Sequence, residues 1–216
     1  MTASTDVSAA DFLPAEWSLP RLSRAAAGCR GCELYRDATQ TVFGKGPAHA
    51  ALMLVGEQPG DVEDREGEPF VGPAGKLLRR ALNEAGIDPD STYLTNAVKH
   101  FRFQTAGSGA RRLHKKPTTG HLRACRPWLQ AELTSVSPRF VVALGATAAQ
   151  SLYGTRFKLT QSRGRLLPIP EDFPGDHDRL EAVMATVHPS AVLRAPDRKM
   201  AYQGFLYDLK VVAGSL

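Results

Sequence analysis

Short apolar runs alternate with segments of helical periodicity along most of this chain. Four apolar runs are typical of buried β-strands, and they lie at residues 51–56, 92–98, 139–145 and 181–190. Three segments carry apolar residues at helical spacing, and they lie at residues 74–86, 120–133 and 197–212. Strands that alternate with helices in this way predict an α/β fold, in which helices cover both faces of a mainly parallel sheet.

The rest of the chain fits around one such domain. A length of 216 residues is typical of a single α/β domain, which we expect to span residues 19–216. Residues 1–18 are expected to be a loosely ordered lead-in. A long polar stretch at residues 102–119 interrupts the alternation and is expected to be a loop.

Composition and charge narrow the class of protein. A hydrophobic content of 43% with 23% charged residues is ordinary for a globular protein with a real core. The net charge of +5 favours a polyanionic partner. No apolar run approaches the roughly 20 residues that cross a bilayer, and the first residues lack a signal-peptide pattern. We therefore expect a cytoplasmic protein without a membrane partner.

Polar motifs follow three of the expected strands. "GEQPGD" comes after the first strand, Asn96 lies at the end of the second, and "HPS" at residues 188–190 follows the last. Ligands of parallel α/β sheets bind at the carboxyl ends of the strands. The three motifs are therefore expected to meet at one ligand site.

The cysteines indicate a metal centre. Cys29 and Cys32 form a CxxC motif and Cys125 lies far downstream, so a histidine is needed to complete a set of four ligands. His100 is the best candidate, although His49 or His121 could take its place. The spacing is compatible with structural zinc, with an iron–sulfur cluster, or with a redox CxxC beside an unrelated cysteine.

Several motifs in a fixed order resemble those of a known family. "GEQPGDVED…GEPFVGPAGKLL", "TNAVKH", "CRPWL", "LGATAA" and "TVHPSAVLR" together resemble a family-four uracil-DNA glycosylase over residues 28–212. The "RRLH" segment, which ends at His114, resembles the DNA-crosslinking branch of that superfamily known as UdgX.

The resemblance implies a three-layer αβα sandwich with a central four-stranded, mainly parallel sheet and a [4Fe–4S] cluster. Most family-four enzymes have a fourth cysteine at the position of His100. The crosslinking branch has a histidine there, as this chain does. The implied ligands are therefore Cys29, Cys32, Cys125 and His100, and this departure favours the cluster over zinc. No amphipathic extension indicates an oligomer, so we expect a monomer, and no organic cofactor is expected.

Excision of uracil requires a pocket for a flipped base. Phe70 fits an aromatic platform, because a base stacks on an aromatic face with ~1–3 kcal/mol. The Asn96 amide can pair with the N3–H and O4 edge of uracil. His188 can donate to the charge that develops on O2. Taken singly, Phe70 could be a core aromatic, Asn96 a cap at a strand end, and His188 part of a turn.

In the "GEQPGD" motif, Gln58 occupies the position at which related glycosylases carry a water-activating aspartate. Glutamine cannot act as a general base. The resemblance and the chemistry of imidazole both favour His114 as the nucleophile toward C1′ of the deoxyribose. Glu57 is the preferred group to activate it, with Asp61 as the alternative. A nitrogen-linked adduct leaves poorly, so a single turnover is expected. Gly56, Gln58 and Asp61 are also expected to line the substrate pocket.

The remaining candidate residues are expected to contact DNA. Arg111, Lys115 and Lys116 are expected to neutralise phosphates, and Arg112 to contact the substrate or hold its loop closed over the pocket. A loop of "SAVLR" is expected to fill the stack that the flipped base vacates. Its contributing residues are Ser190, Val192, Leu193 and Arg194. Single-stranded DNA is the preferred partner, because less stacking is lost there.

Two other functions remain compatible with the sequence. One is a conventional hydrolytic family-four glycosylase in which the basic loop plays no part in chemistry. The other is a metal-stabilised nucleic-acid-binding module without catalysis, which would bind DNA regardless of uracil.

Overall fold

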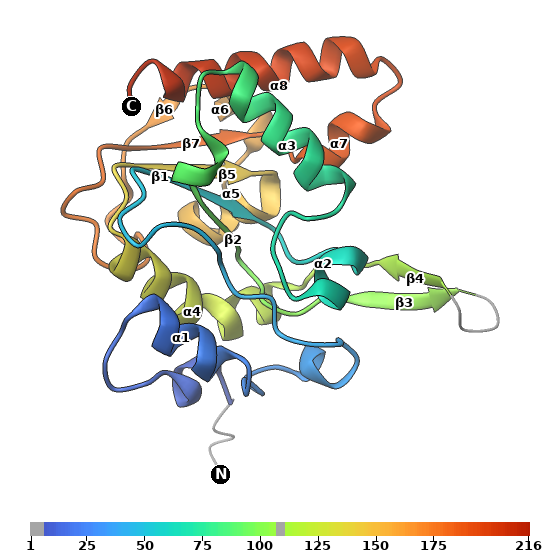
Figure 1. Ribbon diagram of the computed structural model, residues 1–216, viewed down its shortest axis with the longest axis vertical. Helices are drawn as coiled ribbons and strands as arrows, with labels where there is room; N and C mark the ends of the chain where they lie inside the picture. The colour runs from blue at the N-terminus through green and yellow to red at the C-terminus, as the bar shows by residue number, and fades with distance from the viewer. Residues whose placement is uncertain (1–6, 107–110) are drawn as a thin grey trace.

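Five strands form the central sheet of the computed structural model, which describes residues 7–106 and 111–216 (Figure 1). The order across the sheet is β2, β1, β5, β7, β6, with the first four parallel and β6 antiparallel to β7. Their bounds are β1 (Leu52–Gly56), β2 (Tyr93–Asn96), β5 (Phe140–Leu144), β6 (Leu166–Leu167) and β7 (Ala182–Thr186). The expected mainly parallel sheet is confirmed, with β6 added as a fifth strand that is too short for a sequence pattern.

Helices cover both faces of this sheet. They are α1 (Leu19–Ala26), α2 (Asp61–Glu66), α3 (Pro73–Glu84), α4 (Thr119–Val136), α5 (Ala146–Tyr153), α6 (Leu159–Ser162), α7 (Pro189–Arg194) and α8 (Arg198–Ala213). Three short 3₁₀ turns complete the set at η1 (Ala9–Phe12), η2 (Glu33–Arg36) and η3 (Pro89–Ser91). None of the helices in the described part of the chain is long and apolar enough to cross a membrane.

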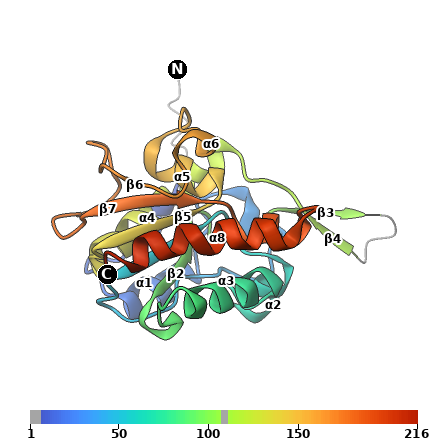
Figure 2. The ribbon, with the colours of Figure 1, turned by 90° about the horizontal axis from the view of Figure 1, so that it is seen from above.

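The apolar strands explain the three layers. Every residue of β1, β5 and β7 is buried, as expected for parallel strands covered on both faces. Alternate residues of β1 point to opposite sides: Leu54 packs with α3 and α8, whereas Met53 packs with α4 and α5. Figure 2 shows α3 and α8 on one side of the sheet and α5 on the other.

The N-terminal segment differs from the expected loose lead-in where it is described. The Ser8 side chain caps η1, whose Ala9 is buried against α4 and the segment around Gly31. A short apolar contact thus orders residues that carry no periodic pattern. Residues 1–6 of the expected lead-in lie outside the described residues.

The polar stretch at 102–119 is not simply a loop. It contains an antiparallel hairpin of β3 (Phe103–Ala106) and β4 (Arg111–His114), which projects from the body beyond α2 (Figure 1). Phe103 pairs with His114 in the register, so the histidine lies at the base of the hairpin, beside the body of the protein. The hairpin therefore holds His114 in a defined position.

Candidate active site

A cavity of about 570 Å³ lies at the carboxyl ends of the parallel strands. Glu57 and Gln58 enter it after β1, Asn96 ends β2, Gly145 follows β5, and His188 follows β7. The cavity is also lined by His114 from the hairpin. The motifs that the sequence places at strand ends do meet at one site, as the parallel topology requires.

One wall of the cavity combines an aromatic ring with an amide. Phe70 has a φ of 57°, which is unusual for a non-glycine residue, and its ring stacks near the His188 ring at a centroid distance of 6.4 Å. Asn96 is 3% exposed, and its side chain has no hydrogen-bond partner within residues 7–106 and 111–216. A Cβ at Gly56 would collide with the Asn96 amide and lie 2.8 Å from the Phe70 ring, so glycine is required there.

His188 is held as a neutral hydrogen-bond donor. Its Nδ1 accepts from the backbone N–H of Ser190 at 3.1 Å, and the Ser190 hydroxyl lies 2.8 Å from the same nitrogen. Burial lowers the pKa of His188 to about 4, with His114 and Arg194 adding repulsion. Because Nδ1 is an acceptor, the ring proton resides on Nε2, which is then a donor.

His114 and Glu57 face each other at the mouth of the cavity. His114 Nε2 lies 3.3 Å from Glu57 Oε1, and the Thr147 hydroxyl donates to the other carboxylate oxygen. Partial burial lowers the pKa of His114, an effect that Glu57 opposes and Arg194 reinforces. The imidazole is therefore neutral near pH 7, and a carboxylate orients it.

The base of the hairpin is fixed by Gln58. Its amide Nε2 donates to the carbonyls of Arg102 and Lys115 at 3.1 and 3.2 Å, and its Oε1 accepts from the Arg102 N–H at 3.2 Å. Gln58 therefore lines the cavity and also joins the two ends of the hairpin at its base, next to His114.

Arg112 anchors the hairpin to α2 and does not line the cavity. Its guanidinium pairs with Asp61 and, at 2.6 Å, with the fully buried Asp64, and it stacks over the rings of Phe101 and Phe103. Arg112 and Asp61, which the sequence predicts as substrate-binding residues, are thus not brought into the cavity, because the two side chains pair with each other outside it. Arg112 holds the hairpin closed, which was the second possibility. Asp61 is also removed as an activator of His114, because the carboxylate beside the imidazole is Glu57.

The expected wedge segment is a helix. Residues 190–194 belong to α7, and Val192 is only 2% exposed because it packs in the core with α3 and α8. Val192 is therefore not available to enter a base stack. Ser190 and Arg194 line the cavity, whereas Leu193 is half-buried on another side of α7.

The expected phosphate-binding residues surround the site. Lys116 lines the cavity itself, and Arg111 and Lys115 are exposed on the hairpin strand and just after it. Lys116 thus borders the same cavity as His114, and Arg111 and Lys115 lie close to His114 in the chain, which agrees with a contact to a polyanion.

The three cysteines lie in a core cluster that also contains residues of α1 and α4. Cys29 and Cys125 are buried in one core cluster with Cys32 packed against it. The Trp128 indole N–H donates to Cys29 Sγ at 3.2 Å, and the Lys99 backbone N–H donates to Cys125 Sγ at 3.3 Å. Burial raises the pKa of Cys125 to about 12 and also raises the pKa of Cys32.

His100 follows Lys99, whose backbone N–H contacts Cys125, but its own ring is bonded elsewhere. Its Nε2 is 2.9 Å from the Thr41 hydroxyl, which leaves Nδ1 for any ligand, and burial lowers its pKa to about 4. Among the described residues, no three His, Cys, Asp or Glu side chains converge on a point where they could hold a metal ion. His121, an alternative ligand, is engaged by Glu33 and by the backbone of Thr118.

Two groups in and near the site were not anticipated. Thr147 bonds the catalytic candidate Glu57, and only its position after the third strand could have indicated this. The buried pair of Lys99 and Glu132 lies behind Asn96, with the Lys99 ammonium 2.8 Å from the Asn96 carbonyl. Glu132 falls at helical spacing between buried residues of α4, which is the signal that could have revealed it.

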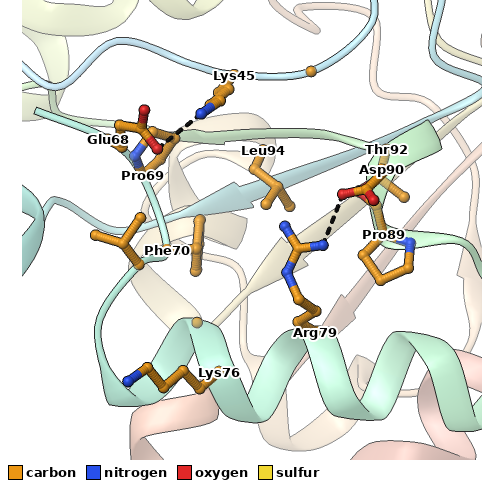
Figure 3. Close-up of a pocket in the computed structure, with 13 residues that line it drawn as sticks. Lys45, Glu68, Pro69, Phe70, Lys76, Arg79, Pro89, Asp90, Thr92 and Leu94 are labelled. Carbon is orange, nitrogen blue, oxygen red and sulfur yellow. Dashed lines mark hydrogen bonds and ion pairs between the residues drawn. The ribbon is translucent and has the colours of Figure 1, made fainter.

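Phe70 also lines a second, smaller cavity of about 290 Å³ (Figure 3). Lys45 pairs there with Glu68, and Arg79 with Asp90, both at distances below 3 Å. Four of its charged groups are bonded to each other in these two pairs, as the dashed lines in Figure 3 show, and among the described residues that line it only Lys76 carries a charge outside them.

Comparison with known proteins decides the family. The model of the uracil DNA glycosylase superfamily matches residues 43–210. The chain belongs to the uracil DNA glycosylase superfamily. It is 34% identical over 174 residues to a type-4 uracil-DNA glycosylase of Thermotoga maritima, covering 80% of this chain and 82% of that protein. A type-4 uracil-DNA glycosylase of Sulfurisphaera tokodaii is 31% identical over 195 residues, covering 87% of this chain and 82% of the relative.

Proposed function

We propose that this member of the uracil DNA glycosylase superfamily excises uracil from DNA and remains covalently attached to the product through His114. The contact between His114 and Glu57 at the mouth of the cavity carries the proposal. Membership of the superfamily and relatives named type-4 uracil-DNA glycosylases support the excision step.

The cavity provides the groups that excision needs. A flipped uracil stacks on Phe70 and pairs with the Asn96 amide, whose hydrogen-bonding groups lack protein partners among the described residues. When the bond between C1′ and N1 breaks, its electron pair moves to uracil. The Nε2–H of His188 donates to O2, where the negative charge develops, and Ser190 keeps that proton on Nε2.

His114 then takes the place of water. The lone pair of one imidazole nitrogen forms a bond to the electron-poor C1′, and the other nitrogen carries the proton that Glu57 or solvent removes afterwards. Glu57 stabilises the positive charge on the sugar and on the ring, because it lies 3.3 Å from Nε2. The product is a neutral N-alkyl imidazole, which is a poor leaving group, so the protein acts once.

The cysteine group fits a [4Fe–4S] cluster held by Cys29, Cys32, Cys125 and Nδ1 of His100. Each ligand of such a cluster binds a different iron, so the ligands need not converge on one point. The N–H groups of Trp128 and Lys99 already point at two of the sulfurs, and hydrogen bonds of this kind tune cluster potentials. The bound cluster would tie the N-terminal segment to α4.

The preferred substrate is single-stranded DNA, bound by a monomer. Extrusion of a base from a single strand costs less than extrusion from a duplex. The cations of the hairpin, Arg111, Lys115 and Lys116, contact the phosphates around the flipped nucleotide.

A denaturing gel tests this function. A single-stranded oligonucleotide with one uracil is expected to give a heat- and detergent-stable band of protein plus DNA, with one uracil released per protein. Thymine in place of uracil is the control and should give no such band. Release of many uracils per protein without the band would identify a conventional hydrolytic glycosylase. Uracil-independent binding without release would indicate a non-catalytic DNA-binding module.

The rate of adduct formation should depend on pH through His114. Its pKa is lowered by burial, so the neutral, nucleophilic ring persists below the ordinary histidine pKa of about 6.5. We expect a constant single-turnover rate between pH 8 and 7, and a tenfold fall per pH unit only below the lowered pKa. Measurement at saturating DNA separates this effect from binding. A rate that already falls above pH 7 would contradict the assignment.

A further inference from the structure

A groove of about 540 Å³ lies on the opposite side of α7 from the candidate active site. It is bounded by α3, α7 and α8, which lie next to one another in Figure 1. His188 and Ser190, at the start of α7, line the active-site cavity, whereas Leu193, near the end of the same helix, lines the groove. One short helix therefore forms a wall of both.

The charge of the groove is one-sided. Four cationic side chains line it, and no acidic residue does so among the described residues; the cations are Lys76, Arg80, Arg198 and Lys199. Arg80 is paired with Glu84 at 2.7 Å, whereas the other three form no ion pair within residues 7–106 and 111–216. Unneutralised cations of this number in one concave site favour an anion with several charges.

The floor of the groove suits a base or a sugar. Leu77 and Leu193 contribute apolar surface, and the Tyr202 ring lies beside them with the Arg80 guanidinium 5.0 Å from its centroid. A cationic groove that contains an aromatic ring is the combination by which proteins hold single-stranded nucleic acid without reading its sequence.

We infer that this groove binds the DNA strand that flanks the flipped uracil, with phosphates on Lys76, Arg198 and Lys199 and a base or sugar against Tyr202 and Leu193. The inference rests on the proposed function, because that function places the same strand at the other side of α7. The groove thus extends the binding site beyond the nucleotide that reacts.

Charge reversal at the N-terminus of α8 tests the groove. Arg198→Glu/Lys199→Glu changes two exposed residues in the first turn, where acidic side chains are compatible with the helix dipole. The matched control is Arg24→Glu/Lys210→Glu, which changes the charge equally at two exposed residues away from the groove.

The substrates are single-stranded oligonucleotides with one nucleotide on each side of uracil, or with ten added on the 5′ or on the 3′ side. Wild type and control should bind the oligonucleotide lengthened on one of the two sides more tightly than the short one. In the groove variant, this ratio of affinities should be at least tenfold smaller. Its salt slope should fall by at least about 1.4, because each lost single-strand phosphate contact removes about 0.7. An unchanged length dependence, or an equal loss in the control, would overturn the inference.

With thymine in place of uracil, the same binding measurements do not depend on excision of a base. If no uracil is released from any substrate, the proposed function is wrong, while the length dependence of binding still decides whether the groove holds DNA.

Discussion

Replacement of His114 by serine is expected to abolish the stable protein–DNA adduct while uracil release continues. Serine removes the imidazole and leaves space in front of Glu57, which faces that ring at 3.3 Å. A water molecule in this space can attack C1′ with the carboxylate as its base. We expect adduct formation to fall by at least about 100-fold, as is typical when a group that acts directly in the chemistry is lost.

Two measurements on the same sample check this expectation. The denaturing gel measures the amount of adduct, and the number of free uracils per protein measures excision. In the serine variant, more than one uracil should be released per protein. His49→Ser is the control, because His49 is exposed and lies outside the cavity. An adduct at the wild-type level in His114→Ser would assign the nucleophile to another residue.

The largest loss of stability is expected from Glu132→Gln. Glu132 and Lys99 are both completely buried, and the Lys99 ammonium also donates to Thr95 and to the Asn96 carbonyl. Glutamine keeps an oxygen that can accept from Tyr93, but it removes the charge that compensates the ammonium. Loss of one partner of a buried pair costs about 3–5 kcal/mol, equivalent to a fall in Tm of roughly 6–20 °C for a chain of this size.

A second substitution separates charge from packing. In Lys99→Met/Glu132→Gln no unpaired charge remains, so the double variant should recover part of the lost free energy of unfolding. Glu181→Gln is the control, because Glu181 forms an exposed pair with Arg139 and such pairs are worth at most about 1 kcal/mol. Thermal unfolding monitored by circular dichroism gives all four values. A loss below about 1 kcal/mol in Glu132→Gln would show that the pair does not stabilise the core.

The strands and their polar ends could be predicted from the sequence because both depend on local information. A run such as "FVVAL" is typical of a parallel strand that is buried on both faces, and the parallel direction then brings Glu57, Asn96 and His188 to one edge. The contact between His114 and Glu57 also agrees with the sequence-based hypothesis.

Features that depend on distant partners could not be predicted. The hairpin of β3 and β4 has four residues in each strand, and its position depends on Arg112 reaching Asp61 and Asp64, about fifty residues away in the chain. The sequence predicts Val192 in a wedge because it is an apolar residue of the "SAVLR" segment, but the core contacts of α7 bury it. Lys99 and Glu132 are far apart in the chain, and only the fold brings them together.

Unlike Glu57, Asn96 and His188, His114 does not come from the sheet or from a segment directly after one of its strands. It lies on a hairpin attached to the body by Gln58 and by a single arginine. The residues that we propose for base recognition and for capture of the sugar thus lie in separate stretches of the chain. Under the proposed function, this hairpin alone would distinguish a glycosylase that marks its lesion permanently from one that turns over, with the pocket for the base unchanged.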